Sequence, residues 1–166
     1  MKFGCVSFVA ALLSLSGPAL AGETNFVAIT QIGEGASVTL DQTEAEDARA
    51  SLTQVGDLNT AHIVQAGGVE AVLLQNGAGN NAVITQRTTG AAEAWLYQNG
   101  DSNSVALDQD GTDNTALTMQ YGDANSIELG QFGDANMATL MQAGIGLALQ
   151  VTQLGGAAIT ITQRGP

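Results

Sequence analysis

The sequence is short of the residues that commonly stabilise small exported proteins and build catalytic or nucleic-acid-binding sites. Its 166 residues include one cysteine, Cys5, one histidine, His62, and four lysines and arginines against sixteen aspartates and glutamates. Cys5 lies in an N-terminal segment that we expect to be removed, so the mature chain would have no cysteine for a disulfide. Its stability must come from another source.

The shortage of positive charge argues against nucleic acid as a partner. Without Lys2, only Arg49, Arg87 and Arg164 oppose the sixteen acidic residues. A surface of this sign is a poor match for a phosphate backbone. The acidity has two interpretations: ordinary solubility, or like-charge repulsion that delays self-association.

Residues 1–21 are typical of a secretory signal peptide. Lys2 gives a basic start, residues 3–15 are apolar, and residues 19–21 form an A-x-A cleavage site. No second long apolar stretch follows, so we expect a cleaved signal and not a membrane anchor. The predicted mature domain is residues 22–166, exported through the inner membrane.

What the mature sequence does contain is a glutamine at an average spacing of eleven residues from Gln31 to Gln163. A fixed period of this kind is the signature of a repeat architecture. Four intervals are ten or twelve residues long, and in each case the change falls in a turn. The predicted stacking glutamines are Gln31, Gln42, Gln54, Gln65, Gln75, Gln86, Gln98, Gln109, Gln120, Gln131, Gln142, Gln153 and Gln163.

Each glutamine ends a seven-residue unit, Asn-x-Ala-x-aliphatic-x-Gln, seen whole at residues 59–65 and 80–86. Alternation at period two predicts a strand whose odd positions face one side. Position five is aliphatic in twelve of thirteen units, with Thr118 the exception, and position three is apolar throughout. These positions are the predicted core, whereas the even positions vary and are expected outside.

Position one is the second amide position of the unit. It is asparagine seven times and otherwise alanine, valine or leucine. We expect these asparagines to stack as the glutamines do, since an amide buried without a partner costs on the order of 1–3 kcal/mol. They are Asn25, Asn59, Asn80, Asn103, Asn114, Asn125 and Asn136.

About four residues separate successive strands, most often as x-Gly-x-x. Glycine allows the positive φ of a tight reversal, and the neighbouring Asp or Asn caps the turn. Four residues cannot hold a crossover helix. The predicted turn glycines are Gly33, Gly56, Gly67, Gly77, Gly100, Gly111, Gly122, Gly133, Gly144 and Gly155.

The pattern therefore predicts an all-β fold, a β-solenoid of about thirteen short strands in two facing parallel sheets. Strands stacked about 4.7 Å apart place glutamine on glutamine and asparagine on asparagine. The first and last units lie close to the ends of the mature domain, and neither is preceded or followed by an evident polar cap. Open ends of a solenoid are templates for another chain.

The unit Gln-x-Gly-x-x-Asn-x-Ala-x-x-x-Gln, as at residues 109–120, resembles the curlin repeat of bacterial curli fibres, and it recurs over nearly all of the mature sequence. The resemblance implies a subunit of a functional amyloid that polymerises with itself and other curlin subunits outside the cell. It also implies outer-membrane secretion and accessory proteins as partners, and roles in adhesion and biofilm.

Three features depart from that family. Residues 22–24 leave no room for a glycine-rich secretion segment, and the units at residues 43–47 and 88–90 are degenerate. The last units look somewhat like the close of a minor, nucleating subunit, so both major and minor roles stay open. The alternative function is a monomeric secreted solenoid that binds a ligand, such as an adhesin passenger or an ice-binding protein.

A few other side chains outside the repeat pattern are of types that form sites. His62 is outward and has no serine or cysteine partner, so we predict no enzyme, no cofactor and no small-molecule substrate. The repeated Asp-x-Asn at residues 101, 123 and 134 offers calcium ligands, but turn chemistry explains it and we predict no metal. Outward Trp95 and Tyr97 suggest a sugar platform, a lateral fibre contact or scattered surface aromatics. The outward threonines 160 and 162 resemble an ice-binding array that other units do not continue.

Overall fold

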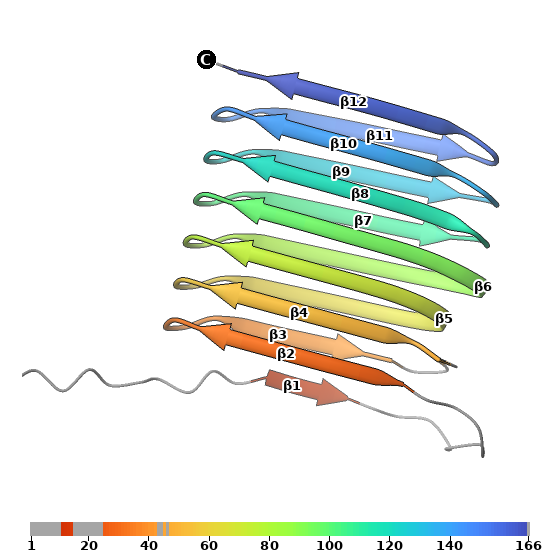
Figure 1. Ribbon diagram of the computed structural model, residues 1–166, viewed down its shortest axis with the longest axis horizontal. Coiled ribbons are helices and arrows are strands. Elements are labelled where there is room, and N and C mark those ends of the chain that lie inside the picture. The colour runs from red at the N-terminus through yellow and green to blue at the C-terminus, as the bar shows by residue number, and fades with distance from the viewer. Residues whose placement is uncertain (1–10, 15–24, 43–44, 46, 166) are drawn as a thin grey trace, which may run out of the picture.

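The computed structural model describes residues 11–14, 25–42, 45 and 47–165, and these residues form strands and turns without a helix. Figure 1 shows the strands stacked as the rungs of a flattened coil. No described helix is therefore long and apolar enough to cross a membrane. The strands are β1 Ala11–Ser14, β2 Phe26–Ile32, β3 Ser37–Asp41, β4 Arg49–Val55, β5 Thr60–Asn76, β6 Asn81–Asn99, β7 Ser104–Asp110, β8 Asn114–Tyr121, β9 Ser126–Phe132, β10 Met137–Ala143, β11 Ala148–Leu154 and β12 Ala158–Arg164.

The rungs form two layers, which we name after one strand in each. The β8 layer contains β2, β4, the second halves of β5 and β6, β8, β10 and β12. The β7 layer contains β3, the first halves of β5 and β6, β7, β9 and β11. Every pairing is parallel, and the chain alternates between layers through short arcs. The predicted parallel β-solenoid is confirmed.

The count of short, separate strands differs from the prediction at β5 and β6. Each contains two of the predicted units, because the strands extend through the arcs near residues 66–69 and 87–92, where their pairing is interrupted only by a register shift between Ala66 and Gly68. These two strands join the layers into one hydrogen-bonded sheet. At both arcs the usual four-residue turn pattern is altered, which lets the strands run on.

Like residues stack on like along each layer. Leu73 pairs with Leu96, Gln75 with Gln98 and Ala71 with Ala94. The inward side chains at positions three and five form one continuous buried cluster from Val38 to Val151. Each buried leucine or isoleucine contributes about 1.5–3 kcal/mol relative to an exposed one. The core therefore runs the length of the coil between the two layers.

Strand β1 extends the β7 layer at its N-terminal end. It pairs with β3 in parallel, Ala11 opposite Val38 and Ser14 opposite Asp41. These residues fall within the predicted signal peptide, whose other residues lie outside the described part of the chain, as does Cys5. The boundary at residue 21 stays a prediction.

Candidate functional site: the stacked amides

The glutamines of the β8 layer form a chain of side-chain hydrogen bonds. Each Nε2 donates to the Oε1 of the glutamine one rung nearer the C-terminus, at 2.7–3.0 Å. Between the first and last of them the side chains are almost completely buried. The residues are Gln31, Gln54, Gln75, Gln98, Gln120, Gln142 and Gln163.

The β7 layer carries an equivalent ladder. The same Nε2-to-Oε1 bonds run in the same direction, at 2.8–3.1 Å. The residues are Gln42, Gln65, Gln86, Gln109, Gln131 and Gln153. The two ladders lie side by side in the interior of the coil, one for each layer.

The second amide proton of the same side chain crosses to the other layer. Gln98 Nε2 donates to the carbonyl of Asn81 at 3.0 Å, and Gln109 Nε2 donates to that of Glu93 at 3.0 Å. Equivalent bonds recur along both ladders. From Gln54 to Gln131, each glutamine therefore bonds to the next rung and to the opposite layer, which explains why this residue type is needed at the end of the strand.

The ladders have a direction, and this leaves different groups at their two ends. At the N-terminal end, Gln42 is 3% exposed and its Oε1 has no hydrogen-bond partner. At the C-terminal end, Gln163 Nε2 donates to the Ala148 carbonyl at 3.2 Å. Gln153 Nε2 donates to two carbonyls, those of Met137 and Ala157. One end of the solenoid thus offers an acceptor and the other a spare donor.

The asparagines stack too, but their bonds run mainly to the backbone. Asn80 Oδ1 accepts the N–H of Asn103 at 3.0 Å, and Asn80 Nδ2 donates to the carbonyl of Gly100 at 2.8 Å. The same pair of contacts links Asn59, Asn103 and Asn125 to the rung above. Direct amide-to-amide bonds occur from Asn80 to Asn59 and from Asn136 to Asn114.

Where asparagine is missing, apolar side chains take its place. Ala48, Val69 and Ala92 occupy position one on three successive rungs of the β8 layer, and with Ala45 they form a second, small buried cluster. Below them, Asn25 Oδ1 accepts the N–H of Ala48 at 3.0 Å. At this edge, next to the arcs with an altered turn pattern, apolar contacts thus replace the hydrogen bonds that asparagine side chains make to the backbone elsewhere.

All ten predicted turn glycines have positive φ, from 64° to 148°. Space also restricts several of them: a Cβ at Gly100 would overlap the carbonyl oxygen of Gly122, and one at Gly122 would overlap that of Gly144. The turns therefore stack as tightly as the strands. Only a residue without a side chain fits at this contact.

The turn aspartates bond to the rung below. Asp123 Oδ1 accepts the N–H of Asp101 at 2.8 Å, and Asp134 Oδ1 accepts that of Thr112 at 2.9 Å. Backbone and side-chain hydrogen bonds from Thr112 lower the pKa of the exposed Asp134 carboxyl below 3.8. No three acidic, histidine or cysteine side chains gather to hold a metal within the part of the chain that the structure describes.

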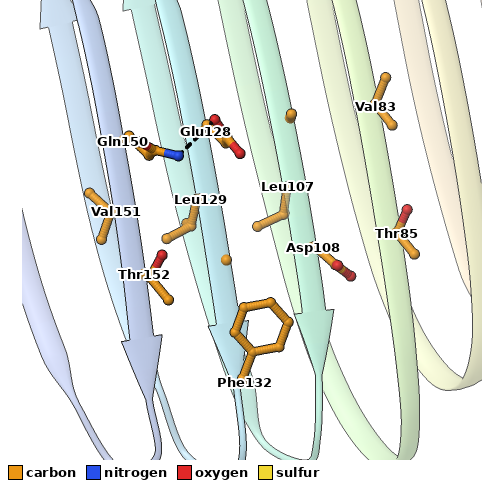
Figure 2. Close-up of a pocket in the computed structure, with 12 residues that line it drawn as sticks. Val83, Thr85, Leu107, Asp108, Glu128, Leu129, Phe132, Gln150, Val151 and Thr152 are labelled. Carbon is orange, nitrogen blue, oxygen red and sulfur yellow. Dashed lines mark hydrogen bonds between the residues drawn. The ribbon is translucent and has the colours of Figure 1, made fainter.

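The other candidate site residues from the sequence lie on the outer faces of the two layers. His62 is exposed on β5, and Thr160 and Thr162 are exposed on β12. A cavity of about 240 Å³ lies on the β7 layer beside Phe132. Figure 2 shows Glu128 bonded to Gln150 at its rim, at 3.1 Å. Asp108, also at the rim, pairs with Arg87 at 3.4 Å. Both carboxylates are thus already engaged, and we assign the cavity no ligand.

The stacked amides agree with what comparison with known proteins finds. Residues 122–155, which contain β9, β10 and β11, match the family model of the curlin associated repeat. No curated protein matches the chain. Both the repeat and the solenoid are structural rather than catalytic features, and they fit a curli-type structural subunit. Residues 122–155 therefore contain a curlin-type repeat.

Proposed function

We propose that the mature chain, residues 22–166, is a subunit of an extracellular, curli-like amyloid fibre in which copies stack end to end. The fibre would serve adhesion and the biofilm matrix. Export would follow the predicted signal peptide, with outer-membrane secretion and accessory proteins as partners. The curlin repeat and the parallel register of every rung support this proposal.

The observation that carries the proposal is the acceptor at the N-terminal end of the β7-layer ladder, Gln42 Oε1, which has no hydrogen-bond partner. Inside the solenoid, every equivalent acceptor of this ladder accepts a hydrogen bond from the glutamine of the rung below. In this structure β1, within the predicted signal peptide, covers β3. A second copy whose C-terminal end stacks beneath β3 would take the place of β1 in the mature chain, supply a donor to Gln42 and continue the ladder from one copy to the next.

Backbone groups favour the same contact. An edge strand presents a row of N–H and C=O groups that another strand can pair with. After removal of residues 1–21, β2 and β3 would be open at one end, and β11 and β12 have no strand above them among the described residues. Three arginines against sixteen acidic residues give residues 22–166 a net charge of 3 − 16 = −13, which opposes this contact, so we expect assembly to begin slowly.

The test is a thioflavin time course with sedimentation on purified residues 22–166. We expect a lag, then conversion to cross-β polymer, and loss of the lag on addition of preformed seed. Gln109→Ala, Gln131→Ala and Gln153→Ala should slow conversion, whereas the outward Gln150→Ala should not. A chain that stays soluble and unseedable would instead be a monomeric solenoid, and the proposal would fail.

A further inference from the structure

The two layers do not contain the same number of rungs. Between Phe26 and Arg164 the β8 layer has seven rungs and the β7 layer has six, counting β5 and β6 once in each. The coil therefore describes a whole number of turns plus one half. This inference rests on the proposed function, and it concerns how one copy is placed on the next.

Two placements keep all strands parallel. In the straight placement, β2 of the upper copy lies on β12 of the lower copy, and β3 of the upper copy is two rungs from β11. One rung of the β7 layer then stays empty at each junction. In the half-turn placement, the upper copy is rotated by half a turn about the stacking axis, so that its β2 lies on β11 and its β3 lies on β12. No rung is then missing.

The hydrogen bonds of the terminal glutamines favour the half-turn. Gln163 on β12 can donate one more hydrogen bond, because its Nε2 donates to the carbonyl of Ala148 alone. Gln153 on β11 already donates to two carbonyls. The ladder acceptor that is buried and lacks a donor is Gln42, next to β3, whereas the first glutamine of the other ladder, Gln31, is partly exposed. Only the half-turn brings Gln163 under Gln42; the straight placement leaves that oxygen beside the empty rung, without a ladder partner.

The edge of β3 also accepts a parallel strand in register. Residues 11–14 occupy it in this structure, with Leu13 opposite Leu40. The described residues of that strand pair with Val38–Asp41, and the Oε1 of Gln42 has no hydrogen-bond partner. The apolar positions three and five of β12, Ile159 and Ile161, would lie opposite Val38 and Leu40 and continue the core.

We propose that successive copies in the fibre are related by a half-turn about the fibre axis, with β12 of one copy pairing with β3 of the next and β11 pairing with β2. In this register, Gln163 donates to Gln42 across the junction. The outer faces of the two layers then alternate along each side of the fibre. Residues 1–21 must be absent, because β1 occupies the surface that β12 takes.

Cysteine cross-linking distinguishes the placements, because the mature chain has no cysteine of its own. Strands one rung apart are about 4.8 Å from each other, within the Cα separation of a disulfide, whereas two rungs are about 9.6 Å. At outward positions, the half-turn places Thr160 opposite Thr39 and Thr152 opposite Thr30. The straight placement puts Thr160 opposite Ala28 instead.

Three double variants of residues 22–166 are polymerised under reducing conditions, sedimented and then oxidised. We expect covalent multimers on a non-reducing denaturing gel for Thr160→Cys with Thr39→Cys, and for Thr152→Cys with Thr30→Cys. The matched pair Thr160→Cys with Ala28→Cys should give none. Each single-cysteine variant can form only dimers, which controls for contacts between neighbouring fibres.

The outcomes separate the two proposals. Multimers from the Thr160 and Ala28 pair, without multimers from the other two pairs, overturn the half-turn and leave the fibre proposal standing. Sedimented polymer with no cross-link from the Thr39 pair also overturns it. Failure of the unmodified chain to polymerise defeats the proposed function, and the half-turn with it.

Discussion

The β7 and β8 layers are alike inside and different outside. Both bury an unbroken glutamine ladder and a row of aliphatic side chains. Outside, the β7 layer carries Asp108 and Glu128, whereas the middle of the β8 layer carries Trp95, which is 43% exposed, together with Leu117 and Met119. Because inward side chains contact the rungs above and below, their identity is restricted. Outward side chains meet solvent, and the two layers have diverged there.

Removing one glutamine from each layer tests whether the two interiors contribute equally to stability. Gln98→Ala in the β8 layer and Gln109→Ala in the β7 layer each leave one buried donor, one buried acceptor and one carbonyl unpaired, and a cavity besides. We expect each to lower the free energy of unfolding by about 3–5 kcal/mol. Urea unfolding of the soluble monomer measures this.

The matched control is Gln150→Ala, which removes an exposed hydrogen bond on the outside of β11 and should cost less than about 0.5 kcal/mol. Losses that differ by more than about 1.5 kcal/mol between the two inward variants would show that the ladders are not equivalent.

The turns allow the same comparison between a residue that contacts the next rung and a residue that is exposed. Gly122→Ala places a Cβ against the Gly144 carbonyl of the next rung at a φ of 99°, so we expect a loss of about 2–4 kcal/mol. Gly146→Ala has a φ of 68° and open space around it, and should cost about 1 kcal/mol. Thermal unfolding of both variants decides; equal losses would mean that rung-to-rung contact contributes nothing.

One inward position differs between the interiors of the two layers. Thr118, in the β8 layer, is fully buried where twelve other units have an aliphatic residue, and its Oγ1 has no hydrogen-bond partner. Thr118→Val keeps the shape and removes the unpaired hydroxyl, so we expect a gain of about 1–2 kcal/mol. Thr139→Val, outward on the neighbouring rung of β10, should change stability by less than about 0.5 kcal/mol, and a similar gain there would contradict the burial explanation.

Much of the interior was predictable because periodicity alone specifies which residues share a face. Position five and the turn glycines could be read from spacing, since only an in-register stack repeats residue types every eleven residues. The continuous pairing through the arcs of β5 and β6 was not predictable, because altered turns look the same in sequence whether they break or extend a strand. The hydrogen bond from the glutamine side chains to carbonyls of the opposite layer was not predictable either, because it depends on the distance between the layers.

The smallest effect concerns charge at the outer turn. The hydrogen bonds from Thr112 lower the pKa of Asp134 from its ordinary value of 3.8, so its stabilising contribution is complete above that value and is lost as the pH falls from there through the lowered pKa. Asp134→Asn keeps an acceptor for the Thr112 N–H without the titration. The variant should therefore lose less stability than the parent between pH 5 and pH 3, by a small margin because the carboxylate is exposed. Parallel urea titrations at the two pH values measure this, and identical losses in the two proteins would show that the bond to Thr112 does not stabilise the charged form.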